Sequence, residues 1–242
     1  MNPKIEIFET PFEVAGAFAE KLIKLMKQKV DQYDSFNVSL SGGNTPKLLF
    51  NILKDKYKER IDWSKINFFW GDERCVPPTD EQSNYNMTKE NLFNFVDIKE
   101  ENIYRIKGED DPEKEAERYA NLLTEKLPEK NGLPLFDLMI LGAGEDGHTA
   151  SIFPNQIDKF YSENLCVTAE HPETRQKRIS LTGKIINNSA TVVFLVTGEN
   201  KAKIISCILR KCEGWDSYPI SKVDPINGDL LWFLDKAAAK FL

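Results

Sequence analysis

The sequence predicts an α/β fold of three layers (αβα), with helices on both faces of a mostly parallel sheet. Short apolar segments alternate along most of the 242-residue chain with longer segments whose apolar residues recur at helical spacing. Several of the apolar segments stop at turns that contain glycine or charged residues, as strands do before a following helix. No internal repeat or linker interrupts this alternation, so we expect a single domain over residues 1–242.

The predicted strands are the short apolar segments. Residues 66–70 are continuously apolar and residues 190–197 are strongly β-branched, which is typical of strands buried on both faces. The segment 128–134, which contains two prolines, is expected to be a loop. In chain order, the predicted strands cover residues 4–9, 36–40, 66–70, 103–106, 136–141, 165–169, 178–181, 190–197 and 230–234.

Residues that commonly cap helices precede most of the predicted helices. Thr10 and Glu13 form a capping box with Pro11 between them, and Thr45 precedes Pro46 in the same way. The further N-cap candidates are Ser83, Asp111 and Asp235. The predicted helices cover residues 11–30, 47–54, 84–93, 112–127, 201–210 and 236–242.

The composition argues against several classes of protein. A net charge of −6 and a pI near 5.2 do not suit non-specific nucleic-acid binding, which needs a basic surface. No apolar segment approaches the roughly 20 residues that span a bilayer, and the first residues lack the apolar segment of a signal peptide. We therefore expect a cytoplasmic protein that binds neither nucleic acid nor membrane. The four cysteines have no metal-site spacing and are expected to be reduced thiols: Cys75, Cys166, Cys207 and Cys212.

The most distinctive segment is 138–154, LMILGAGEDGHTASIFP, in which an apolar strand runs into a glycine-rich turn. The turn contains His148, one of only two histidines, and Asp146. Ligands of parallel α/β sheets bind beyond the carboxyl ends of the strands, so His148 stands where a catalytic imidazole is expected. The alternative is a turn histidine that only bonds to backbone. The flanking glycines and Asp146 favour a functional role.

Three other strand ends carry residues suited to an anion. Residues 41–45, Ser-Gly-Gly-Asn-Thr, could cradle a phosphate at a helix N-terminus, and Arg74 in the turn Asp72-Glu73-Arg74 offers a planar fork for phosphate or carboxylate. Lys201, in the first turn of a helix, opposes the helix dipole, and this small cost is explained if Lys201 faces an anion. Arg178 is a further candidate for an anion contact. Each feature alone has a structural alternative: a tight turn, an internal ion pair, an exposed lysine or a solvated loop. Together, at one sheet edge, they favour a phosphorylated small molecule beside His148.

These motifs resemble those of the glucosamine-6-phosphate isomerase/6-phosphogluconolactonase family, in particular its lactonases. The resemblance runs from about residue 10 to the C-terminus and is carried by SGGNTP (41–46), DERCVP (72–77) with Ser83-Asn84, and the highly specific GEDGHTASIFP (144–154). RISLT (178–182), GENKA (198–202) and LWFLD (231–235) are also similar to family segments.

The resemblance implies a Rossmann-like sheet, as in glucosamine-6-phosphate deaminase and ribose-5-phosphate isomerase. It implies hydrolysis of 6-phospho-D-glucono-1,5-lactone to 6-phospho-D-gluconate in the oxidative pentose phosphate pathway, without metal or organic cofactor. His148 would be the general base that activates water, and Asp146 would orient or polarise it. We expect a monomer or weak homo-oligomer. The residues expected to bind the substrate are Ser41, Gly42, Gly43, Asn44, Thr45, Asp72, Glu73, Arg74, Asn84, Gly144, Gly147, Arg178 and Lys201.

Two other functions compete with the lactonase. The related deaminase has a glutamate five residues after its histidine, where this chain has Phe153, and an aromatic residue where it has Arg74. Both differences favour the lactonase. A non-catalytic sugar-phosphate sensor would keep the phosphate-binding turn but would need no base at His148. The sequence does not assign individual cations to individual oxygens of the substrate.

Overall fold

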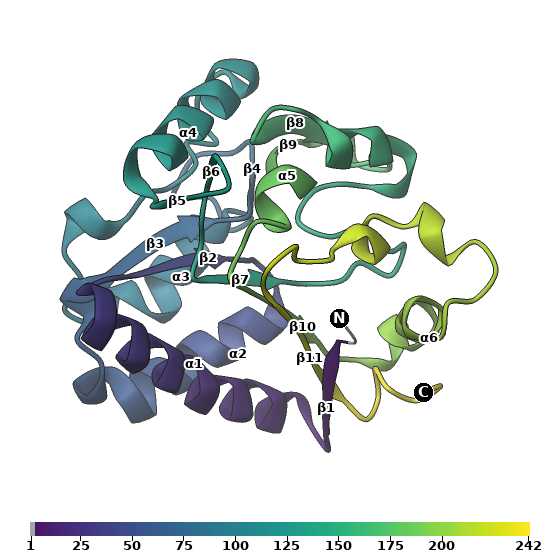
Figure 1. Ribbon diagram of the computed structural model, residues 1–242, viewed down its shortest axis with the longest axis horizontal. Helices are drawn as coiled ribbons and strands as arrows, with labels where there is room; N and C mark the ends of the chain where they lie inside the picture. Colours follow the sequence, from purple (N-terminus) through teal and green to yellow (C-terminus); the bar gives the residue numbers. More distant parts are fainter. Residues whose placement is uncertain (1–2) are drawn as a thin grey trace.

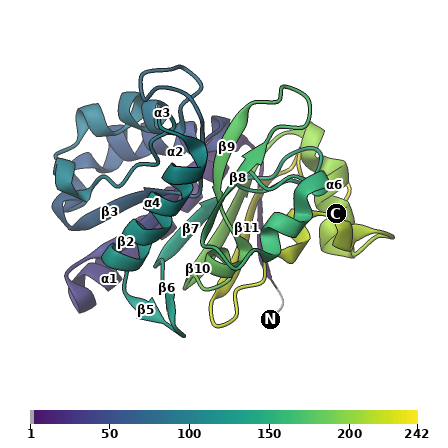
Figure 2. The same ribbon diagram turned by 90° about the horizontal axis from the view of Figure 1, so that it is seen from above.

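A parallel six-stranded sheet forms the centre of the computed structural model, which describes residues 3–242. Its strand order is β1-β11-β10-β7-β2-β3, and Figure 2 shows most of these strands side by side in this order. The strands are β1 (Lys4–Phe8), β2 (Phe36–Leu40), β3 (Ile66–Trp70), β7 (Leu138–Leu141), β10 (Thr191–Val196) and β11 (Asp229–Asp235). All five pairings are parallel, which confirms the predicted fold class.

Layers of helix and strand cover the two faces of this sheet. Figure 1 shows α1 (Pro11–Tyr33) and α2 (Asn44–Ile52) below it, and α4 (Pro112–Lys126) and α5 (Gly183–Ile186) above it. The remaining α-helices are α3 (Asn84–Asn91) and α6 (Ala202–Arg210). A π-helical turn, Leu53–Tyr57, follows α2. Short 3-10 helices cover Lys58–Arg60, Trp63–Lys65, Phe93–Phe95, Glu100–Asn102, Pro154–Tyr161, Glu199–Lys201, Trp215–Ser217 and Pro219–Lys222.

Two of the predicted strands belong to a second sheet. β8 (Cys166–Glu170) and β9 (Lys177–Leu181) pair antiparallel, and β4 (Asp72–Arg74) joins β9 as the third strand. The small sheet follows β3 almost directly, because Gly71 connects β3 to β4 and its carbonyl accepts the N–H of Leu181 at 2.8 Å. The charged turn predicted after residue 70 is therefore itself a strand.

The predicted helix starts are largely correct. Thr10 Oγ1 accepts the N–H of Glu13, and the side chains of Ser83 and Asp111 cap α3 and α4. The N-cap of α2 is Gly43 rather than Thr45, which lies inside the helix and bonds through Oγ1 to Thr197 Oγ1 at 2.8 Å.

Three expectations about secondary structure are wrong. Residues 103–106 form only one β-bridge, from Ile103 to Phe68, and no strand. The backbone bonds to side chains instead: the carbonyl of Arg105 accepts from Arg118, and the N–H of Lys107 donates to Glu115. Residues 236–242 form turns rather than a helix, since the N–H groups of Lys240 and Leu242 donate to carbonyl groups three residues back instead of four. The segment 128–134 is a hairpin of β5 (Glu129–Lys130) and β6 (Leu133–Pro134), whose two turn residues have the positive φ that an Asn-Gly pair tolerates.

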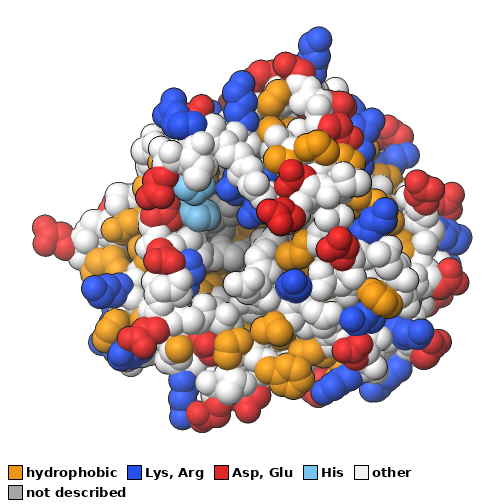
Figure 3. Space-filling view, turned by 180° about the vertical axis from the view of Figure 1, so that it is seen from behind, with side chains coloured by type: hydrophobic (Ala, Val, Ile, Leu, Met, Phe, Trp, Pro, Cys, Tyr) orange, Lys and Arg blue, Asp and Glu red, His pale blue; other side chains and the backbone are white. Residues whose placement is uncertain are grey.

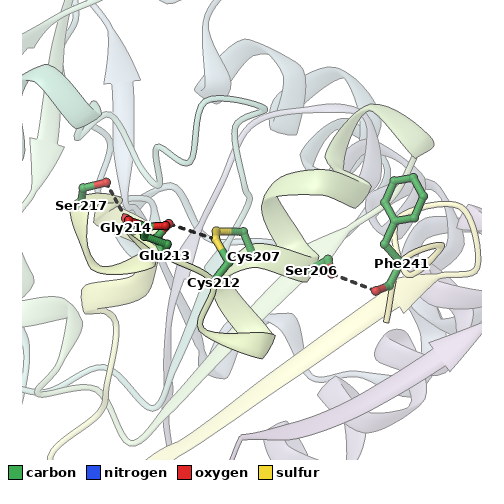
Figure 4. Close-up of a disulfide and its surroundings, with 7 residues drawn as sticks. All are labelled: Ser206, Cys207, Cys212, Glu213, Gly214, Ser217 and Phe241. Atoms are coloured by element: carbon green, nitrogen blue, oxygen red, sulfur yellow. Dashed lines mark hydrogen bonds between the residues drawn. A yellow bond between two sulfur atoms is a disulfide. The ribbon is translucent and has the colours of Figure 1, made fainter.

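Two of the four cysteines are not reduced thiols, contrary to expectation. Cys207 and Cys212 form a disulfide at the C-terminal end of α6, with their Cα atoms 4.8 Å apart (Figure 4). Lys211 has a left-handed conformation (φ 54°), which turns the chain back so that the N–H of Cys212 donates to the carbonyl of Cys207. Cys75 and Cys166 are free thiols.

Candidate active site

The carboxyl ends of β2, β3, β7 and β10 bring the predicted turns to one edge of the sheet. Figure 3 shows this face, with histidine atoms at the edge of a recess. A cavity of about 180 Å³ is lined by Ser41, Gly42, Gly43, Asp72, Arg74, Asn84, Gly142, Ala143, His148, Ala150 and Arg178. The predicted site residues from three strand ends and from β9 thus meet in one pocket.

A second cavity, of about 560 Å³, adjoins the first. The two cavities share four residues that have no side chain or only a methyl group: Gly42, Gly43, Gly142 and Ala143. The second cavity adds Asn44, Thr45 and Lys201 to the wall. A small elongated molecule could therefore lie across the shared glycines, with one end beside His148 and the other beside Lys201. Among the described residues, a larger groove between α4 and β8, of about 830 Å³, contains none of the predicted site residues.

His148 and Asp146 form the central polar pair of the site. Nδ1 of His148 lies 2.6 Å from Oδ1 of Asp146, which also accepts the backbone N–H of His148 at 3.2 Å. Burial alone would raise the pKa of Asp146, but the hydrogen bond and the charge of His148 lower it below the ordinary value of 3.8. An ionised carboxylate can only accept, so in the neutral form of the imidazole Nδ1 carries the proton and Nε2 keeps its lone pair.

Two glycines make room for this pair. A Cβ on Gly144 would overlap both the imidazole of His148 and the carboxylate of Asp146. Gly147 has a φ of +82°, and a Cβ there would also overlap the ring of Tyr218. The sequence predicted Gly144 and Gly147 as substrate-binding residues; the structure places both where they shape the histidine turn, outside the wall of either cavity.

An aromatic side chain supports the face of His148. The ring of Phe153, which is fully buried, lies 4.8 Å from the His148 ring between centroids. The ring of Phe153 also lies 5.2 Å from the ring of His171 between centroids. His171 does not line the pocket, and its Nδ1 accepts backbone N–H groups of its own loop. Sequence reasoning used Phe153 only as a difference from the deaminase and missed this packing role.

Asp72 lies in the wall of the pocket, whereas Asp146 lies outside it, and two side chains hold Asp72 in place. Oδ2 accepts the hydroxyl of Ser151 at 2.5 Å, and the carbonyl oxygen of Asp72 accepts the side-chain amide of Asn84 at 2.9 Å. Asp72 and Asn84 are nearly fully buried among protein atoms. Ser151 connects the histidine turn to β4. Ser151 belongs to the same sequence motif as His148, but the sequence did not indicate that it bonds to Asp72.

Arg74 and Arg178 lie directly opposite each other in the pairing of β4 with β9. Burial and the neighbouring Arg74 charge lower the pKa of Arg178 below its ordinary value. Nη1 of Arg74 donates to the carbonyl of Gln82, but within residues 3–242 Nε of Arg74 and Nε of Arg178 are buried without an acceptor. Two adjacent cations with spare donors on a pocket wall suit an anionic ligand.

Glu73 lies behind the pocket rather than in its wall, although it was expected to bind substrate. Its carboxylate bonds to residues at the start of α3 and to β4. Burial raises the pKa of Glu73, and the backbone N–H groups of Tyr85, Asn84 and Arg74 oppose that shift.

The glycine-rich turn and Lys201 form the far end of the combined cavity. Gly43 has a φ of +107° and leaves the N-terminus of α2 without a side-chain cap. Nζ of Lys201 lies 3.7 Å from Oε1 of Glu145, which also accepts the side-chain amide of Asn200 at 2.5 Å. Free helix N–H groups and a lysine together form an anion-binding arrangement.

The comparison with known proteins agrees with this geometry. A model of the family "Glucosamine-6-phosphate isomerases/6-phosphogluconolactonase" matches residues 9–232, which is most of the chain. The chain belongs to this family. It is 44% identical over 229 residues to a 6-phosphogluconolactonase of Haemophilus influenzae, covering 93% of this chain and 97% of that protein. It is 41% identical over 197 residues to a 6-phosphogluconolactonase of Treponema pallidum, covering 81% and 82%.

A solved structure resembles the whole fold. The 6-phosphogluconolactonase of Trypanosoma brucei superimposes with a TM-score of 0.86 at 28% identity, covering 99% of this chain and 98% of that one. The resemblance to the lactonases of this family is therefore confirmed, and with it that the protein is an enzyme of the family. Within residues 3–242, no helix is long and apolar enough to cross a membrane.

Proposed function

We propose that this family member hydrolyses 6-phospho-D-glucono-1,5-lactone to 6-phospho-D-gluconate, with His148 as the general base. The observation that supports this most directly is the 2.6 Å contact between Oδ1 of Asp146 and Nδ1 of His148, whose side chain lies in the wall of the pocket. It leaves Nε2 as an acceptor for the proton of an attacking water. The names of its 41–44% identical relatives support the same substrate.

The reaction would proceed by addition and ring opening. A water molecule adds to the carbonyl carbon C1 while Nε2 of His148 takes its proton. The carbonyl oxygen becomes an oxyanion, which Arg74 and Arg178 in the same pocket can stabilise. The bond from C1 to the ring oxygen then breaks, and protonated His148 returns its proton to that oxygen. This step leaves a carboxylic acid, which releases its proton to solvent at neutral pH, and the two arginines can also bind the resulting carboxylate.

The phosphate belongs at the other end of the substrate. In this proposal it lies in the adjoining cavity, at the N-terminus of α2 and beside Lys201. The chain of carbon atoms between C1 and the phosphate would cross the shared positions Gly42 and Gly142. At Gly142 a Cβ would meet no atom within 4 Å, so this position leaves room for the substrate to approach the backbone closely. Asp72 and Asn84 are then placed to contact sugar hydroxyls.

The test is an assay on freshly generated 6-phosphogluconolactone, because the lactone also opens spontaneously. We expect opening well above the enzyme-free rate and no release of ammonia from glucosamine 6-phosphate. A protein that binds 6-phosphogluconate without accelerating lactone opening would be a sensor. Ammonia release without lactonase activity would instead make it a deaminase.

A further inference from the structure

Glu73 points to the opposite side of β4 from its two neighbours. Side chains alternate along a strand, so Asp72 and Arg74 share the pocket side. Glu73 instead lies beneath the first turn of α3 and is only 2% exposed. It lines neither cavity of the candidate active site. Of these three consecutive charged residues, Asp72 and Arg74 therefore face the pocket, and Glu73 faces the start of α3.

The protein itself saturates the Glu73 carboxylate. Oε1 accepts the backbone N–H groups of Arg74 and Asn84, both at 2.8 Å. Oε2 accepts the backbone N–H of Tyr85 at 2.8 Å and the hydroxyl of Ser83 at 3.0 Å. A negative charge at a helix N-terminus is also favoured by the helix dipole. With four donors bound, Glu73 has no role left as a direct ligand of the substrate.

Two of the residues that Glu73 holds face the pocket. The amide of Asn84 fits between Asp72 and Gly42, where a Cβ on Gly42 would overlap it. A small shift of the first turn of α3 would therefore move Asn84 against its neighbours. The backbone N–H of Arg74 donates to the carboxylate of Glu73, and Arg74 lies on the same strand as Asp72. One carboxylate thus fixes α3 to β4 at the point where both supply pocket residues.

We propose that Glu73 is a positioning residue for substrate binding, which sets the places of Asn84 and Arg74 in the pocket by tying the start of α3 to β4. This inference rests on the proposed function, since it concerns the same pocket. It replaces the expectation that Glu73 contacts the substrate. Loss of its bonds should weaken ligand binding more than it slows the chemical step.

The experiment compares Glu73→Gln with Asp137→Asn. Glutamine keeps the size of the Glu73 side chain but replaces one acceptor oxygen by an NH₂ group. That NH₂ group would face backbone N–H donors and could not accept a hydrogen bond from them. Asp137 is a matched control because its carboxylate also accepts a backbone N–H, that of Asn37, at 2.9 Å. It precedes β7 and so lies at the N-terminal ends of the strands, away from the pocket. Both variants are first shown to be folded by circular dichroism.

The readouts are the Kd of 6-phosphogluconate by titration calorimetry, and KM and kcat on the lactone. For Glu73→Gln we expect Kd and KM to rise about tenfold or more while kcat falls less than about threefold, as for lost ground-state binding. Asp137→Asn should keep Kd and KM within about twofold of wild type. Unchanged Kd and KM in Glu73→Gln, a fall in kcat alone, or an equal rise of Kd in both variants would overturn the proposal.

Ser83→Ala covers the case in which Glu73→Gln does not fold. It removes one of the four donors and should raise the Kd of 6-phosphogluconate by about two- to fivefold; an unchanged Kd would overturn the proposal. The calorimetric Kd also separates this inference from the proposed function. Wild-type protein that binds 6-phosphogluconate but does not open the lactone would refute the lactonase function and leave the role of Glu73 open to the same measurement.

Discussion

Oδ1 of Asp146 lies 2.6 Å from Nδ1 of His148, and this contact decides which imidazole nitrogen is available to the substrate. The ordinary pKa of an aspartate carboxyl, 3.8, already leaves it ionised at neutral pH, and the lower pKa of Asp146 strengthens this, so the carboxylate accepts the Nδ1 proton. Nε2 is left as the only basic nitrogen of the ring. The two residues are separated only by Gly147, so a single turn would place both the proposed base and the proposed orienting group.

Replacing His148 by alanine should lower kcat on the lactone by about 10²–10⁴, the usual contribution of a general base. The fold should persist, since His148 is partly exposed at the pocket. The measurement is steady-state kinetics above the enzyme-free rate. The matched control is His171→Ala, which also removes an imidazole ring that contacts Phe153 and should change kcat much less. A folded His148→Ala with wild-type kcat would contradict the assignment.

Replacing Gly144 by alanine should lower kcat by about 10–10² without removing any catalytic side chain. Its new Cβ would occupy the space of the contact between His148 and Asp146, so one of them must move. Gly16→Ala is the control for the same chemical change, because a Cβ there meets no atom within 4 Å. Equal kcat in the two variants would show that the spacing of the pair does not matter.

The pair should also contribute to stability in a pH-dependent way. The folded pKa of Asp146 is lower than its ordinary value of 3.8. Its contribution is therefore fully present above about pH 3.8 and is lost as the pH falls through the folded pKa. Urea unfolding of wild type and Asp146→Asn at several pH values measures this. The stability difference should shrink below pH 3.8, and a difference that grows towards acid would contradict the direction of the shift.

The parallel sheet and the shared edge could be predicted because strand periodicity and abrupt strand ends are local signals. Ser41, Asp72 and His148 follow different strands, yet parallel pairing alone requires their turns to lie at one edge. The sequence therefore predicted most of the pocket wall. It could not predict the pairing of β4 with β9, which places Arg178 opposite Arg74 through contacts far apart in the chain.

The directions of individual side chains could not be predicted from the neighbouring sequence. Glu73 was expected to face the substrate because it stands between Asp72 and Arg74, but the turn is a strand, and alternation directs Glu73 away. Similarly, the disulfide depends on the left-handed turn at Lys211, which no spacing rule for cysteines indicates. The Asn131-Gly132 pair was a usable hairpin signal that the prediction of a loop overlooked.

The two ends of the cavity should discriminate between anions. Lys201→Ala should weaken competition by inorganic phosphate, because Lys201 lies at the end assigned to the phosphate. Arg74→Ala should instead weaken competition by gluconate, whose carboxylate matches the product end, and Arg74→Lys should not fully restore it because lysine lacks the planar fork. Inhibition constants of both anions against both variants make the measurement. Equal effects on both anions in both variants would contradict the assignment of the two ends.

The disulfide should stabilise the fold without taking part in catalysis. Cys207 and Cys212 close a short loop, for which the loss of chain entropy in the unfolded state corresponds to about 2 kcal/mol. They lie at the opposite end of α6 from Lys201, roughly two turns of helix away, so the candidate site should be unaffected. We therefore expect the double variant Cys207→Ser/Cys212→Ser to lose about 2 kcal/mol in urea unfolding. Its kcat/KM should stay within about twofold of wild type. Wild type reduced with dithiothreitol is the control and should match the variant. Equal stability of oxidised and reduced wild type, or a large loss of kcat/KM in the variant, would contradict this view.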